Sequence, residues 1–157
     1  MWAISWRLWT SAGKRTIDAP ALLRDTHVWV WLMAGTEDKL SPTTRERIDQ
    51  ASRAGHLKVS AISVWEVAML EARGRIKLNL DCLGWVRQAL SQPGTELVPL
   101  SPEIAVSSTR LPADFHGDPA DRILVATARE RALTLVTQDA KILDYGAHKY
   151  LRVMHAA

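Results

Sequence analysis

Residues 22–29 read Leu-Leu-Arg-Asp-Thr-His-Val-Trp, and this stretch decides the fold class. The apolar run Ala21 to Leu23 is short and bounded by polar residues, as in a strand. A second apolar run, His27 to Met33, ends near Gly35 and is typical of a helix. The stretch therefore predicts a buried strand that passes directly into a helix, with Asp25 at the junction.

The same alternation of short apolar runs and helical segments continues along the chain. We expect further strands at 57–61, 97–100, 133–137 and 151–154, and helices at 42–54, 63–73, 81–90, 102–110 and 118–131. The expected strands are apolar without clear alternation, which is typical of a parallel sheet covered on both faces. The fold class predicted is therefore α/β, a three-layer α/β/α fold with a mostly parallel central sheet.

Length and composition fit one soluble domain. The chain has 157 residues, of which 47% are hydrophobic and 24% are charged. Its only cysteine is Cys82, so no internal disulfide can form and a cytoplasmic location is expected. No apolar run approaches the ~20 residues that span a bilayer, so no membrane partner is expected.

Residues 1–20 are expected to be a leader, and residues 21–157 the folded domain. The leader is interpreted as disordered or as an extension from an upstream start codon. Of the 20 basic and 17 acidic side chains, four basic and one acidic lie in residues 1–24, so the remaining charges balance. The domain is therefore not a broadly basic nucleic-acid-binding protein, and it would need local patches or metal ions to bind nucleic acid.

Acidic residues fall at the strand-to-helix junctions of the expected sheet. In a parallel sheet these junctions gather at one edge, where ligands bind. Crowded carboxylates repel each other, and a hard divalent cation such as Mg²⁺ or Mn²⁺ relieves that repulsion. The pattern therefore favours a metal site formed by some or all of five acids, which are Asp25, Glu66, Asp118, Asp121 and Asp139.

The acids also have a purely structural interpretation. Ser63 and Glu66 match the spacing of a capping box, and Asp118 with Asp121 matches a helix cap followed by an acid in the first turn. Asp139 suits a turn. Asp25 is harder to explain in this way because it ends an apolar strand. From the residues alone, a metal site and a set of helix caps both stay open.

Four ordered motifs resemble those of PIN domains of the VapC type. Each motif is weak alone, but the ordered set spans about residues 21–154. The first motif is the stretch quoted above, residues 22–29, and the second is residues 59–68, which contain Ser63-Val64-Trp65-Glu66. The third is residues 116–128, which contain Asp118-Pro119-Ala120-Asp121, and the fourth is residues 135–139, which end in Asp139.

The resemblance implies an acidic quartet of Asp25, Glu66, Asp121 and Asp139. Asp25 and Asp121 would bind one or two Mg²⁺ ions most directly, with Mn²⁺ as a substitute. Glu66 and Asp139 would complete the site directly or through water. Asp118 would be mainly a cap that could still reach the metal or its water.

Several neighbouring residues are possible accessories to this quartet. Hydroxyls on Thr26, Ser63 and Thr137 could orient a carboxylate or a water, although helix capping is the favoured interpretation for all three. His27 and His116 could approach the substrate.

Two features depart from the family pattern. Arg24 stands where the family usually has an apolar residue. It is expected to face solvent at the strand end or to reach a phosphate, and the first interpretation is favoured. The leader has no counterpart in the family.

Three tryptophans in or beside the motifs also have a structural interpretation. They are interpreted as core or interface residues, namely Trp29, Trp31 and Trp65.

The function implied is hydrolysis of RNA phosphodiester bonds by an endoribonuclease that serves as the toxin of a VapBC toxin–antitoxin pair. The resemblance also implies a homodimer and an inhibiting VapB-like antitoxin, with contacts expected on the helices at 42–54 and 63–73. Two alternatives are a non-catalytic PIN-like module that binds RNA or protein, and a receiver-like phosphoacceptor domain. The complete quartet argues against the first, and the lack of adjacent acids after the first strand argues against the second.

Overall fold

Five parallel strands form the centre of the structure, a computed structural model that describes residues 20–157. Their order in the sheet is β3-β2-β1-β4-β5, and every neighbouring pair is parallel. This confirms the predicted parallel sheet. The strands are β1 (Leu22–Arg24), β2 (Leu57–Ser60), β3 (Thr95–Val98), β4 (Thr134–Thr137) and β5 (Val153–His155).

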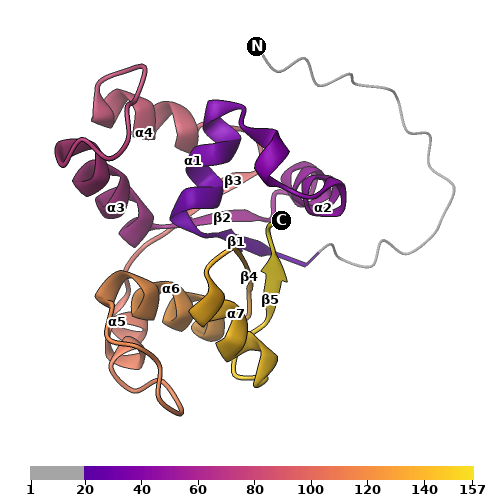
Figure 1. The fold of residues 1–157 in the computed structure, drawn as a ribbon, viewed down its shortest axis with the longest axis vertical. Helices are drawn as coiled ribbons and strands as arrows, with labels where there is room; N and C mark the ends of the chain where they lie inside the picture. Colours follow the sequence, from indigo (N-terminus) through magenta and orange to yellow (C-terminus); the bar gives the residue numbers. More distant parts are fainter. Residues whose placement is uncertain (1–19) are drawn as a thin grey trace, which may run out of the picture.

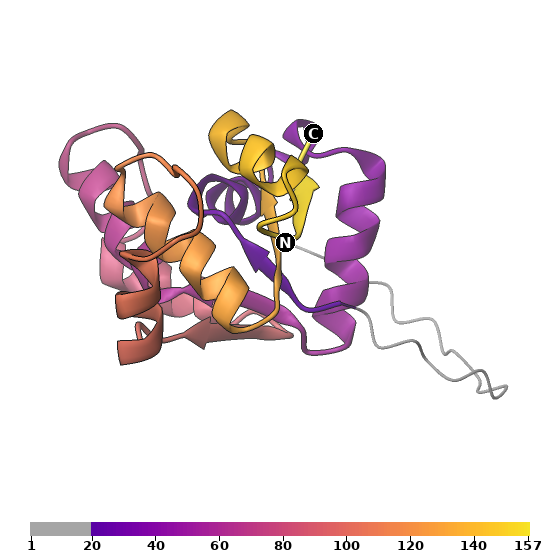
Figure 2. The ribbon, with the colours of Figure 1, turned by 90° about the horizontal axis from the view of Figure 1, so that it is seen from below.

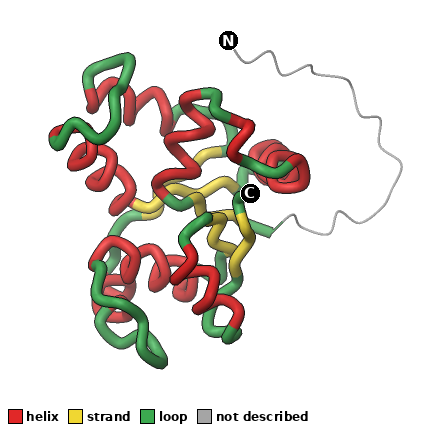
Figure 3. Tube along the Cα trace, viewed as in Figure 1, coloured by secondary structure: helices red, strands yellow, loops and turns green. Residues whose placement is uncertain are grey.

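Helices cover both faces of this sheet, as Figures 1 and 3 show. In Figure 1, α1 to α4 lie on one side of the strands and α5 to α7 on the other; Figure 2 shows the same layers from below. The helices are α1 (Thr26–Ala34), α2 (Pro42–Arg53), α3 (Ala61–Ala72), α4 (Cys82–Leu90), α5 (Pro102–Ser108), α6 (Pro119–Glu130) and α7 (Ala140–Ala147), with a short 3-10 helix at Glu37–Lys39.

The central strand β1 explains why the strand sequences do not alternate. Leu22 packs with residues of α1 and α2, whereas Leu23 packs with residues of α5, α6 and α7. Both side chains are buried because successive residues of a strand point to opposite faces and both faces are covered. A strand in this position therefore favours apolar residues on both of its faces, as at Leu22 and Leu23.

Some predicted boundaries are wrong. Helix α3 begins at Ala61 with Ser60 as its cap, so Ser63 lies inside the helix and forms no capping box. Strand β3 begins two residues earlier than expected, at Thr95, because this edge strand is largely exposed and its register follows the pairing with β2.

Helix α7 was not expected from the sequence. Asp139 caps it by accepting hydrogen bonds from the backbone N–H groups of Lys141 and Ile142. Gly146, which argues against a helix here, is required by packing: a Cβ at this position would lie 2.4 Å from Val153 Cγ2. Close contact of α7 with β5 thus overrides the weak helix propensity of glycine.

Residues 1–19 lie outside the described part of the chain, and with them nearly all of the expected leader. Within residues 20–157, none of the helices combines the length and the apolar character needed to cross a membrane.

Arg24 is buried, so its interpretation as a solvent-facing residue is wrong. Its side chain is 3% exposed and reaches toward β3, where Nη2 donates to Thr95 Oγ1 at 3.2 Å. Nε has no partner, and Arg24 forms no ion pair with any residue in the described range. Burial lowers its pKa to about 10, which shows that the fold disfavours the charge.

Replacing this arginine should stabilise the protein. Arg24→Leu removes a buried charge with a single neutral partner, so we expect the free energy of unfolding to rise by ~1–3 kcal/mol, measured by urea denaturation. The matched control is Arg53→Leu on the exposed side of α2, which should change stability by less than ~0.5 kcal/mol. A loss of stability in Arg24→Leu would mean that the bond to Thr95 outweighs the cost of burying the charge.

Candidate active site

Asp25 and Thr137 meet where β1 and β4 end. Asp25 precedes α1 but makes no side-chain capping bond, so its carboxylate is free to accept elsewhere. Thr137 Oγ1 donates to Asp25 Oδ2 at 2.6 Å, and both side chains are buried. Thr137 Oγ1 also accepts a hydrogen bond from the backbone N–H of Asp139 at 3.0 Å. One hydroxyl therefore connects two acids of the quartet.

Glu66 is held by a second hydroxyl pair. Thr26 Oγ1 lies 2.8 Å from Ser63 Oγ and 3.0 Å from Glu66 Oε1. A carboxylate can only accept, so the single hydroxyl proton of Thr26 serves Glu66, and the hydroxyl of Ser63 can donate to Thr26. Helices α1 and α3 are thereby connected beside the first acid.

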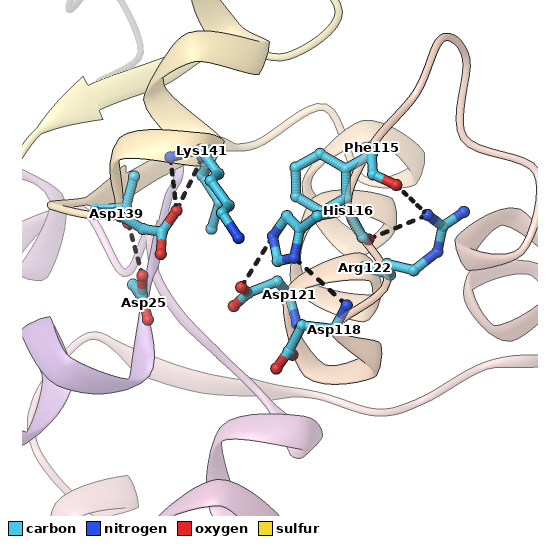
Figure 4. Close-up of polar contacts among 10 residues, drawn as sticks. Asp25, Phe115, His116, Asp118, Asp121, Arg122, Asp139 and Lys141 are labelled. Atoms are coloured by element: carbon cyan, nitrogen blue, oxygen red, sulfur yellow. Dashed lines mark hydrogen bonds and ion pairs between the residues drawn. The ribbon is translucent and has the colours of Figure 1, made fainter.

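The third segment is the first turn of α6. Asp118 is its cap and accepts a bond from the backbone N–H of Asp121 at 3.0 Å, as expected from the sequence. The side chain of Asp121 does not cap, and its Oδ2 lies 3.1 Å from His116 Nε2. Figure 4 shows Asp25 and Asp139 on one side, Asp118 and Asp121 on the other, and Lys141 extending between them.

The predicted acids share one electrostatic environment. The pKa of Asp121 is raised to about 7, first by burial and then by repulsion from Asp118, Asp139, Asp25 and Glu66. Burial is also the main cause that raises the pKa values of Asp25 and Glu66, against the opposing hydrogen bonds from Thr137 and Thr26. The structure thus brings the other four acids within electrostatic reach of Asp121.

These carboxylates do not form a preformed ligand cage. Among residues 20–157, no group of three or more His, Cys, Asp or Glu side chains is arranged so that it could hold a metal ion. The donor chemistry nevertheless suits Mg²⁺, since the set offers carboxylate oxygens whose raised pKa values a nearby cation would lower. The metal site therefore stays a prediction.

The three accessory hydroxyls are not helix caps, contrary to the favoured interpretation. The cap positions are Asp25, Ser60 and Asp139, and the hydroxyls instead hold the acids and their backbone. Asp139 is both a quartet member and a cap: its Oδ1 accepts two backbone bonds, at 2.9 and 3.0 Å. Whether an acid caps depends on its rotamer, which spacing alone does not reveal.

Arg122 has a positioning role that the sequence did not reveal. Its guanidinium donates to the backbone carbonyls of Ser108, Phe115 and His116, at 2.8, 2.8 and 3.3 Å. These bonds fix the loop that carries His116 beside Asp121. The only available signal was the position of Arg122 directly after Asp121.

Removing the Thr137 hydroxyl should impair the site without removing an acid. If Asp25 binds the metal that the resemblance implies, Thr137→Val should lower the rate of RNA cleavage ~10–100-fold, as is typical when a group that orients a metal ligand is lost. Stability should fall by ~1–3 kcal/mol because the N–H of Asp139 loses its partner. Thr137→Ser keeps the hydroxyl and should restore most of the rate. Equal losses in both variants would show that the methyl group, not the hydroxyl, matters.

Known proteins resemble this chain in sequence and in structure. Residues 22–147 match the family described as the PIN domain. The curated protein Ribonuclease VapC22 of Mycobacterium tuberculosis is 37% identical over 124 residues, which cover 79% of this chain and 91% of that protein.

Two solved complexes share the fold. VapBC2 from Rickettsia felis, bound to a DNA fragment from its promoter, gives a TM-score of 0.61 at 14% identity and covers 85% of this chain and 96% of its own. DNA-bound VapBC from Salmonella typhimurium gives 0.64 at 15% identity, with 88% and 99% covered. At these identities the likeness concerns the fold alone.

Proposed function

The chain belongs to the PIN-domain family, and from this premise we propose that it is a metal-dependent endoribonuclease, the toxin of a VapBC toxin–antitoxin pair. The observation that carries the proposal is that Asp121 feels the charges of Asp25, Glu66 and Asp139, which come from three other segments of the chain. Resemblance to a protein named as a ribonuclease, over most of the length of both chains, supports it.

The acids would bind Mg²⁺, or Mn²⁺ in its place. Asp25 and Asp121 would be direct ligands, and Glu66 and Asp139 would complete the site directly or through water. A bound ion would supply a water of lowered pKa as nucleophile and would offset negative charge on the phosphate. Without a cation the carboxylates would repel RNA, so the metal also serves substrate binding.

The surrounding residues would hold the acids ready for this task. Thr137 fixes the Asp25 carboxylate, and Thr26 orients Glu66. Backbone bonds engage Oδ1 of Asp139 and leave Oδ2 for the site. His116, 3.1 Å from Asp121, would stabilise the charged form of that carboxylate when its Nε2 carries a proton.

An antitoxin is the proposed protein partner, as in the VapBC complexes that share the fold. Exposed apolar side chains on and beside α3 and α4 offer it a surface, namely Trp65, Leu80 and Leu83, and Trp65 is 56% exposed. The other expected contact helix, α2, exposes no large hydrophobic residue among those described. A homodimer and a cytoplasmic location stay predictions.

The proposed activity can be tested with the purified chain and total cellular RNA. We expect cleavage with Mg²⁺, loss of cleavage with excess EDTA, and recovery when Mn²⁺ is added. Cleavage that EDTA does not reduce would contradict the metal mechanism. RNA binding without any cleavage would indicate a non-catalytic PIN-like module.

A further inference from the structure

A hollow of about 340 Å³ lies beside the acids and has no role in the function proposed so far. Its walls include Phe115, His116 and Tyr145, and its rim carries Lys141, Asp114 and Asp144. We call it the aromatic pocket. Figure 4 shows the rings of Phe115 and His116 facing the side of the site where Lys141 extends.

The rings of the aromatic pocket are held in place before any ligand binds. The ring of Phe115 lies 4.4 Å from that of His116 and 4.9 Å from that of Tyr145, centroid to centroid. Arg122 holds the backbone of Phe115 and His116, and the Tyr145 hydroxyl donates to the carbonyl of Pro112 at 2.7 Å. A ligand that stacks here would therefore lose little free energy to ordering of the pocket.

Two residues that line the aromatic pocket contact acids of the quartet. His116 contacts Asp121 at 3.1 Å, and the backbone N–H of Lys141 donates to Asp139. The pocket therefore shares one wall residue and one rim residue with the surroundings of the quartet. A group seated in it would adjoin a phosphate at the acids.

We propose that the aromatic pocket holds one unpaired nucleobase of the substrate RNA, next to the phosphodiester that is cleaved, and so gives cleavage its sequence preference. The inference rests on the proposed ribonuclease activity. Single-stranded RNA is recognised by stacking its splayed bases on Phe, Tyr and His side chains. Lys141, which is exposed and is the cation at the rim, would contact a flanking phosphate.

Binding can be measured without cleavage in the Asp25→Asn background. The probes are short single-stranded RNAs that carry a fluorescent adenine analogue at each position in turn, whose emission falls when it stacks. We expect quenching at one position and a ~5- to 150-fold loss of affinity when Phe115→Leu is added, the range that stacking of one base supplies. An abasic residue at that position should weaken binding to the Asp25→Asn protein, and it should have little further effect once Phe115→Leu is present.

Two further variants complete the test: one is a control for disturbed packing, and the other tests the contact with phosphate. Tyr150→Leu removes a ring that stacks on Tyr145 but does not line the pocket, so binding should not change. Lys141→Gln lies at an exposed position, and it should reduce the slope of log affinity against log salt by ~1. Unchanged quenching in Phe115→Leu, or an unchanged salt slope in Lys141→Gln, would overturn the inference.

Cleavage-site mapping separates failure of the inference from failure of the proposed function. Wild-type sites should share a base at one position, and Phe115→Leu should lose that preference while it still cuts. If the wild type cuts no RNA, the ribonuclease proposal fails. If it cuts and Phe115→Leu keeps the same preference, only the aromatic pocket is wrong.

Discussion

Asp25→Asn is expected to lower the rate of RNA cleavage about 1,000-fold, since a metal ion supplies several kcal/mol of charge stabilisation and each ~1.4 kcal/mol is a factor of ten. Asparagine keeps the shape of the side chain and can still accept the bond from Thr137. The change therefore removes the charge and leaves the local packing intact. The measurement is the initial rate on one defined RNA in Mg²⁺.

The loss of rate in Asp25→Asn should not come from unfolding. Burial raises the pKa of Asp25, so the fold disfavours its charged form, and the neutral amide should leave stability unchanged or higher. Asp49→Asn, on the exposed side of α2, is the matched control and should cleave at the wild-type rate. A rate within ~10-fold of wild type in Asp25→Asn would remove Asp25 from the proposed metal ligands.

The metal-free protein should lose stability as the pH rises from about 4 to about 8. The folded pKa of Asp121, about 7, lies above the unfolded value of 3.8, so between these values the folded state binds more protons. The contribution of Asp121 to the free energy of unfolding is thus fully present below pH 3.8 and is lost as the pH rises through about 7. The loss should be ~2 kcal/mol, because solvent screening at this partly exposed side chain reduces the full linkage value.

The substitution Asp121→Asn should raise the stability of the metal-free protein and lower its stability when Mg²⁺ is present, both relative to wild type. Without metal at pH 8, urea denaturation should find the variant more stable than wild type, because it lacks the disfavoured charge. With Mg²⁺ the wild type should be the more stable protein, because binding to the folded state adds stability. A variant that is less stable under both conditions would argue that Asp121 has a structural role, such as its contact with His116.

Much of the fold could be predicted from local patterns. Ser41 and Ser101 cap helices that begin at the prolines after them, and Asp118 caps α6 in the same way. The starts of the helices expected at 42, 102 and 118 were therefore predicted correctly to within one residue, because capping is a contact between residues close in the chain. The prediction failed for α7, where Gly146 is tolerated only because Val153, from another element, occupies the space that its side chain would need.

For the candidate site as well, local patterns predicted one part and tertiary packing decided the other. The sequence by itself determined which acids follow the strands and, through their order, which family the chain resembles, because the residue types and their spacing are local properties. Only the tertiary structure decided that Thr137 serves Asp25, that Arg24 is buried and that Phe115, His116 and Tyr145 form one pocket. Each of these depends on which side of an element faces which neighbour, and that is set by packing between segments distant in the chain.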